Sequence, residues 1–108
     1  MIEISKADWK LFRARSPEWQ ESYMEKLNLE YIELLSSDEA ASEKFWALEK
    51  RIRQDKHMPG VQLKLKKSEV WWDLVQLLGD GAITEADLEG FSEDLKELVL
   101  QRVKTYYE

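Results

Sequence analysis

Apolar residues recur along most of the chain at intervals of three and four, a spacing that gathers side chains on one face of an α-helix. The first helix is predicted to start at Ser5, a residue type favoured at the N-cap, with the acid Asp8 three positions later. The Ser-Pro-Glu sequence at 16–18 is a second start signal, because proline suits the first helical position. The pattern therefore predicts one short helix ending near Arg15 and a new helix ending near Ser36.

Two amphipathic helices are predicted over residues 17–58. The first has one broad apolar and aromatic face, formed by Trp19, Tyr23, Met24, Leu27, Tyr31, Leu34 and Leu35. The second opens with Ser-Asp-Glu at 37–39 and stops before the Pro-Gly pair at 59–60. Its apolar stripe consists of Ala41, Phe45, Leu48 and Ile52. We expect this stripe, and Phe45 in particular, to lie in the hydrophobic core.

Over residues 61–66 the spacing of apolar positions changes, and apolar side chains alternate with polar ones. A period of two is typical of extended backbone. The alternation predicts an extended connector, with a short strand at 61–65 paired with residues 1–4 as the alternative. A two-stranded ribbon is marginal on its own, which favours the connector.

The C-terminal part of the chain returns to helical spacing. Ser68 is expected to cap a helix over 70–78 that is apolar around most of its circumference, and is therefore buried on most sides or meets a second subunit. Glycines at 79 and 81 end it, and Thr84 and Ser92 each start a further helix. The last helix buries Leu95, Leu98, Val99, Val103 and Tyr106. The chain is thus predicted to be all-α, a compact bundle of five or six helices.

Residues 74–88 read as leucines, an acidic-glycine turn, Ile-Thr and then acids. This order resembles the helical hairpin of short C-terminal (SHOCT-type) modules, and the resemblance extends over residues 74–98. It implies a helical hairpin suited to packing or oligomerisation. The chain departs from the pattern after Leu88, because Gly-Phe-Ser at 90–92 breaks the second helix where such modules usually continue with basic residues.

Composition narrows the class of protein. A chain of 108 residues, 44% hydrophobic and 35% charged, is expected to form one globular domain spanning 1–108. The absence of cysteine excludes disulfides, a thiol nucleophile and a cysteine-bound metal. Of the five tryptophans, Trp9, Trp19 and one of the pair Trp71 and Trp72 are expected in the core. No apolar run is long enough to span a bilayer and the N-terminus does not resemble a signal peptide, so we expect a cytoplasmic protein.

Charge is unevenly distributed along the chain, whose formal net charge is −6. Residues 50–67, which we call the basic block, contain one acid, Asp55, and seven basic residues: Lys50, Arg51, Arg53, Lys56, Lys64, Lys66 and Lys67. Basic residues near a helix C-terminus commonly offset the helix dipole or pair with acids of the same chain. The alternatives are a docking surface for a protein partner or for a polyanion such as nucleic acid, which the net charge disfavours.

The sequence shows no set of residues that carries catalysis or binds a metal. His57 is the only histidine, so the chain has no pair of histidine ligands, which argues against a zinc site. The turn around Gly81 shares a glycine with calcium-binding loops but lacks two of their leading carboxylates. The many paired acids fall on predicted solvent faces. We therefore expect no enzymatic activity, no cofactor and no metal.

The favoured function is a small protein-interaction module that docks a protein partner, or a second copy of itself, through the basic block and exposed aromatics. The candidate residues are Lys50, Arg51, Arg53, Lys56, Lys64, Lys66, Lys67, Trp46 and Trp72. An immunity-protein or antitoxin-like inhibitor is one alternative, marked by an acidic face with tyrosine such as Glu30, Tyr31 and Glu33. A polyanion binder using the basic block is the other.

Overall fold

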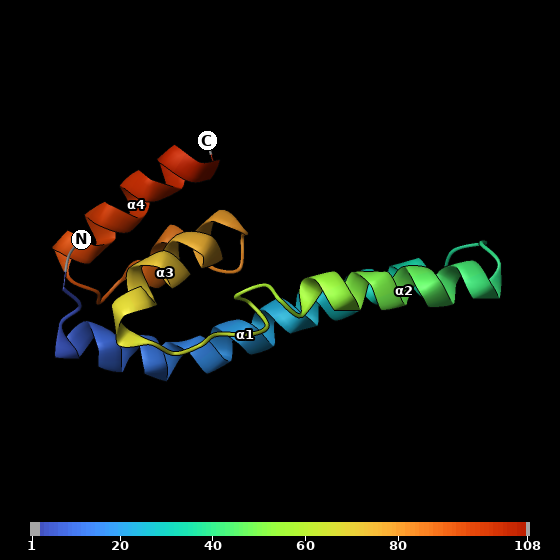
Figure 1. Ribbon diagram of the computed structural model, residues 1–108, viewed down its shortest axis with the longest axis horizontal. Coiled ribbons are helices and arrows are strands. Elements are labelled where there is room, and N and C mark those ends of the chain that lie inside the picture. The colour runs from blue at the N-terminus through green and yellow to red at the C-terminus, as the bar shows by residue number, and fades with distance from the viewer. Residues whose placement is uncertain (1–2, 108) are drawn as a thin grey trace.

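The computed structural model describes residues 3–107, and this part of the chain is helical without any strand (Figure 1). The elements are α1 (Lys6–Leu35), α2 (Ala41–Asp55), η1 (Lys67–Glu69), α3 (Val70–Gly79), η2 (Glu85–Leu88) and α4 (Glu93–Tyr107). The predicted all-α class is confirmed. The predicted number of helices is wrong, because these residues form four α-helices and two short 3₁₀-helices.

The helix α1 runs without interruption through Pro17, where the sequence predicted two separate helices. A proline inside a helix removes one backbone hydrogen bond and is normally destabilising. Here Phe12, Ser16 and Trp19 are buried on either side of the proline, at the spacing of one helical face. Their packing holds the helix together across Pro17. The predicted start is confirmed, since the Ser5 side chain accepts a hydrogen bond from the Asp8 N–H at 3.1 Å.

Two other predicted helix starts are displaced. The helix α2 begins at Ala41 rather than at residues 37–39, and its N-cap residue, Ala40, makes no side-chain cap. Ser68 lies inside η1, so that Glu69 precedes α3. At η2 the predicted signal is correct, because the Asp87 carboxylate accepts a hydrogen bond from the Thr84 N–H at 2.8 Å.

One part of the molecule, which we call the head, consists of the first half of α1 (residues 6–22) with α3, η2 and α4. Its core residues are Ile4, Phe12, Trp19, Val70, Leu74, Val75, Leu77, Ile83, Leu88, Phe91, Leu95 and Val99. Trp19 is buried as predicted, whereas Trp9, Trp71 and Trp72 are half-buried at the edge of this core. The head therefore contains almost all of the hydrophobic core.

A partly buried polar contact joins the two ends of the head. The Asp8 carboxylate accepts hydrogen bonds from the Ser92 N–H at 2.9 Å and from its hydroxyl at 2.6 Å. The same Ser92 oxygen accepts a weaker bond from the Leu95 N–H at 3.4 Å, which places it at the start of α4. The first turn of α1 is thereby fixed to the first turn of α4.

The other part, which we call the hairpin, consists of residues 24–55, the second half of α1 and all of α2. It projects away from α3 and α4, so the molecule measures 51 × 28 × 21 Å (Figure 1). The radius of gyration is 16.2 Å, compared with about 13 Å for a compact domain of this length. The predicted compact bundle is therefore wrong in its overall shape.

The chain returns from the hairpin to the head through a connector without regular structure over residues 62–66, and no strand forms at 61–65. The alternative pairing with residues 1–4 lies partly outside the described residues, at Met1 and Ile2. The connector is fixed to α1 where the Gln20 side-chain amide donates to the Val61 carbonyl at 3.2 Å. Gly60 is buried against the ring of Tyr23.

We expect Gly60→Ala to destabilise the protein by about 1–3 kcal/mol, the usual cost of overpacking. A Cβ at this position would overlap the Tyr23 ring, so either the ring or the connector must move. Urea denaturation measures the loss. The control is Gly81→Ala, which meets no neighbouring atom but is strained by its positive φ of 78°. Replacing Tyr23 by Leu as well should recover part of the Gly60→Ala loss and none of the Gly81→Ala loss.

Candidate protein interface

The hairpin exposes most of the large apolar side chains that solvent reaches. Nine such side chains are exposed among residues 3–107. Six of them belong to the hairpin: Leu29, Ile32, Leu35, Phe45, Trp46 and Ile52. From residue 28 to residue 55 no residue is buried. A surface of this kind is unusual for a soluble domain and typical of an interaction site.

The expectation that Phe45 lies in the core is wrong, because 63% of its surface is exposed, and Ile52 is 45% exposed. Leu48 is the one half-buried residue of the stripe, and the other half-buried residues of α2 are Lys44, Ala47, Glu49, Arg51 and Asp55. The predicted stripe lies at the edge of the contact with α1, where Ile52 lines a hollow between the two helices, and α3 and α4 are too distant to cover it (Figure 1). The amphipathic pattern is present as predicted, but no other element among residues 3–107 covers its apolar stripe.

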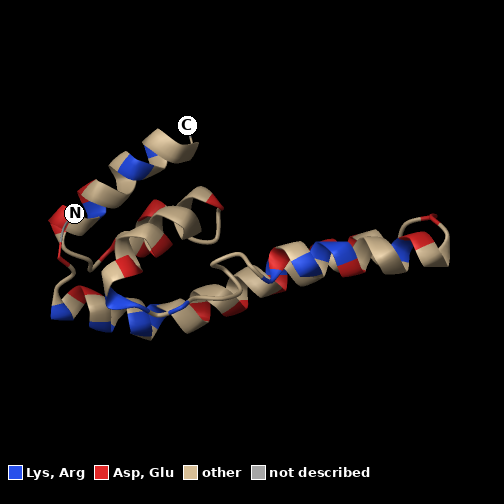
Figure 2. Ribbon diagram, in the orientation of Figure 1, with Lys and Arg blue, Asp and Glu red and all other residues tan. Residues whose placement is uncertain are grey.

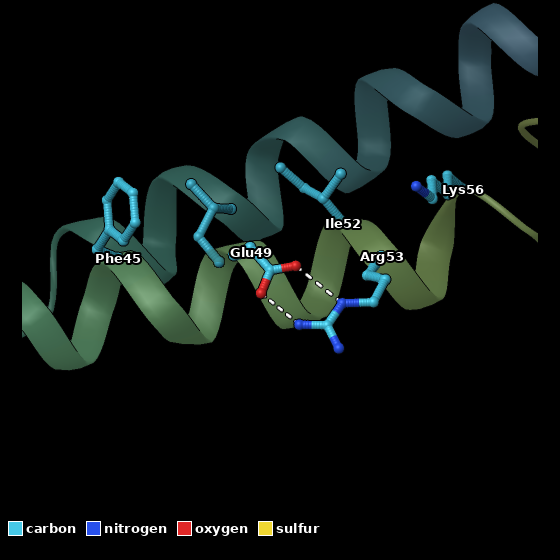
Figure 3. Close-up of a pocket in the computed structure, with 6 residues that line it drawn as sticks. Phe45, Glu49, Ile52, Arg53 and Lys56 are labelled. Atoms are coloured by element: carbon cyan, nitrogen blue, oxygen red, sulfur yellow. Dashed lines mark hydrogen bonds and ion pairs between the residues drawn. The ribbon is translucent and has the colours of Figure 1, made fainter.

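Two adjoining hollows follow this stripe. One, of about 290 Å³, is lined by Phe45, Leu48, Glu49, Ile52, Arg53 and Lys56. The other, of about 270 Å³, lies between α1 and α2 and is lined by Met24, Leu27, Asn28, Tyr31, Ile52, Asp55, Lys56 and Val61. Since both include Ile52 and Lys56, they form one groove. Figure 3 shows Phe45 and Ile52 on one edge of α2, with the Glu49–Arg53 ion pair beside them.

Polar contacts hold α2 against α1. The Arg51 guanidinium lies 2.8 Å from a Glu30 carboxylate oxygen and 3.4 Å from the Asp55 carboxylate. The Tyr31 hydroxyl donates a hydrogen bond of 2.6 Å to Asp55. Burial, together with this bond, raises the pKa of Tyr31 to about 12. Hydrogen bonds and ion pairs thus join the two helices of the hairpin beside its half-buried apolar residues, while the apolar stripe is left open.

The basic block does not form one surface. Arg51 is committed to Glu30 and Asp55, and Arg53 pairs with Glu49 on the same helix. Lys50 and Lys56 lie exposed on or next to α2, whereas Lys64, Lys66 and Lys67 lie exposed on the connector and η1. Figure 2 shows these as two separate basic areas, one on the hairpin and one along the head.

The two candidate tryptophans also lie apart. Trp46 is on α2 and 63% exposed, as expected for an anchor, and its ring meets the Phe45 ring edge-on at 5.0 Å. Trp72 is half-buried in the head, 5.7 Å from the Trp71 ring and 5.4 Å from the Tyr106 ring. The acidic face considered for an inhibitor is not available as a unit. Glu30 and Tyr31 contact residues of α2, and of these three residues only Glu33 makes no such contact among the described residues.

The sequence reasoning missed Asp73, a buried acid on α3. Burial, with a smaller contribution from Glu69, raises its pKa to about 6. One of its carboxylate oxygens has no hydrogen-bond partner within residues 3–107. A signal was available, since Asp73 is the single charged residue in the apolar run 70–78.

Comparison with the models of known protein families, with curated protein sequences and with solved structures found no match to this chain. The resemblance of residues 74–98 to SHOCT-type modules therefore stays a prediction. In the described part of the chain, no group of three or more His, Asp or Glu side chains is placed to hold a metal. No helix over the same residues is both long and apolar enough to cross a membrane.

Proposed function

We propose that this chain is a non-enzymatic protein-interaction module and that the hairpin is its contact surface. The observation that carries this proposal is the open stripe on α2, where Phe45 and Ile52 are exposed along a groove and the exposed Trp46 ring packs against Phe45. Burying a side chain of this size on binding is worth about 1.5–3 kcal/mol. Exposed aromatic residues beside a hollow are typical of the anchors that dominate the energy of protein interfaces.

The charges around the groove would orient a partner rather than supply most of the affinity. Lys56 lines both hollows, and the Glu49–Arg53 pair borders one of them. Charged groups at the rim of an interface mainly affect the association rate and the specificity. The connector residues Lys64, Lys66 and Lys67, and Trp72 of the head, are not part of this surface.

The test compares two triple variants in affinity capture from nuclease-treated lysate. The hairpin variant is Phe45→Ala/Trp46→Ala/Ile52→Ala, and the matched control is Lys64→Gln/Lys66→Gln/Lys67→Gln. We expect a partner retained by the wild type and the control to be lost by the hairpin variant. The reverse result, with binding lost only by the control, would contradict the proposal and favour a polyanion or acidic partner of the connector. Circular dichroism checks that both variants remain helical.

A further inference from the structure

We infer that the occupant of the groove is a second copy of this chain, with the two α2 helices packed antiparallel about a two-fold axis near Leu48 and Glu49. This inference rests on the proposed function, because it uses the same surface of the hairpin. Its content is the identity of the partner and the direction in which the two helices run.

The first argument is the spacing of the apolar stripe. Ala41, Phe45, Leu48 and Ile52 follow one another at intervals of four, three and four. These intervals are those of a helix–helix seam, in which each apolar side chain inserts between residues of a facing helix. An antiparallel pair centred near Leu48 places Phe45 of one copy opposite Ile52 of the other. Both exposed side chains are then covered by a single contact.

The second argument is the order of charges along α2. The exposed acids Asp38 and Glu39 directly precede α2, and Glu43 lies in its first turn. Toward the other end are the exposed basic residues Lys50, on the side away from the stripe, and Arg53 and Lys56, which line the hollow beside it. A parallel pair would place acid against acid and base against base. An antiparallel pair places each acidic end against the basic end of the other copy. The surface is therefore complementary to itself, as a two-fold symmetric contact requires.

The third argument is the position of the groove. It continues from α2 onto α1, where Met24, Leu27 and Asn28 line its second hollow. A second hairpin packed on this face would complete a four-helix arrangement, the usual way in which amphipathic helix pairs bury their apolar sides. Because the hairpin projects from the head, α3 and α4 do not obstruct its approach (Figure 1).

The absence of cysteine allows a direct test of the geometry. A single Glu49→Cys variant, close to the axis, is expected to give a disulfide-linked dimer on mild oxidation. Ala41→Cys and Lys56→Cys should not cross-link alone but should cross-link with each other when mixed. Lys104→Cys, on the exposed end of α4, is the matched control and should not cross-link. Cross-linking of Ala41→Cys or Lys56→Cys with itself alone would overturn the antiparallel arrangement.

A charge exchange tests the partner identity without a covalent bond. One variant carries Lys50→Glu/Arg53→Glu/Lys56→Glu, and the other carries Asp38→Lys/Glu39→Lys/Glu43→Lys. Each alone is expected to be a monomer of 12.8 kDa by sedimentation equilibrium, while the wild type and the mixture of both variants give twice that mass. A single Ile52→Glu substitution is expected to give a monomer with an unchanged helical spectrum.

The failure of this inference is distinguishable from the failure of the proposed function. A wild type that remains monomeric at about 100 µM, a concentration well above the Kd of a stable dimer, overturns self-association. The hairpin would then serve a different protein, and the capture experiment with the hairpin variant still decides whether it does. A dimer that persists in Ile52→Glu overturns the inference in a second way, because the contact would lie on another surface.

Discussion

Leu74→Ala is expected to lower the free energy of unfolding by about 2–5 kcal/mol, the range for deleting a fully buried aliphatic side chain. Leu74 has 0% of its surface exposed and lies in the core of the head. Phe45→Ala removes a larger side chain but is expected to change the stability of the monomer by less than about 0.5 kcal/mol, as for other exposed positions. Residue size alone would predict the larger loss of stability for Phe45→Ala, whereas burial predicts it for Leu74→Ala.

The measurement is urea denaturation followed by circular dichroism at about 1 µM protein. Dilution matters because a dimer stabilises the folded chain in proportion to the logarithm of its concentration. Repeating the experiment at a hundredfold higher concentration should therefore raise the stability of the wild type and not that of Phe45→Ala. A large loss for Phe45→Ala that is the same at both concentrations would mean that the stripe of α2 is covered within the monomer, and would remove the basis of the proposed interface.

Local sequence signals predicted the elements that depend on short-range chemistry. The helical spacing, the Ser5 cap, the Thr84 start and the end of α3 near Gly79 all involve residues within one or two turns of each other. The break at Pro17 was predicted on the same grounds and is wrong. There the long-range packing of Phe12 and Trp19 in the head outweighs the local preference, and no short-range pattern reports it.

The candidate site could be predicted only in part, because amphipathicity does not say what covers an apolar face. The pattern placed Phe45 and Ile52 correctly on one stripe of α2, but it could not show that α3 and α4 pack elsewhere. Trp46 was expected as an exposed anchor and is exposed. The prediction that the basic block forms one surface is wrong. The chain turns at Pro59 and the connector leads back to the head, so basic residues that are close in sequence lie on different parts of the molecule.

Asp73→Asn is expected to raise the free energy of unfolding at pH 7 by about 2–3 kcal/mol, which is the equivalent of a pKa difference of about two units. Burial beside Glu69 raises the pKa of Asp73 in the folded protein to about 6, from 3.8, and Lys64 offsets only part of this. The folded state therefore binds the proton more tightly than the unfolded state does. As the pH rises from about 4 to about 6, the wild type loses stability through this group, and above pH 6 the full cost of the buried charge remains.

The pH dependence separates this effect from a general improvement in packing. The stability of wild type and Asp73→Asn, measured by urea denaturation at pH 4, 5, 6 and 7.5, should converge at the acid end and diverge with rising pH. Other carboxyl groups titrate in the same range, but they are common to both proteins and cancel in the difference. The control is Glu97→Gln on the exposed side of α4, which should show no such divergence. A constant difference between wild type and Asp73→Asn at every pH would mean that Asp73 ionises in the folded protein as it does in the unfolded chain.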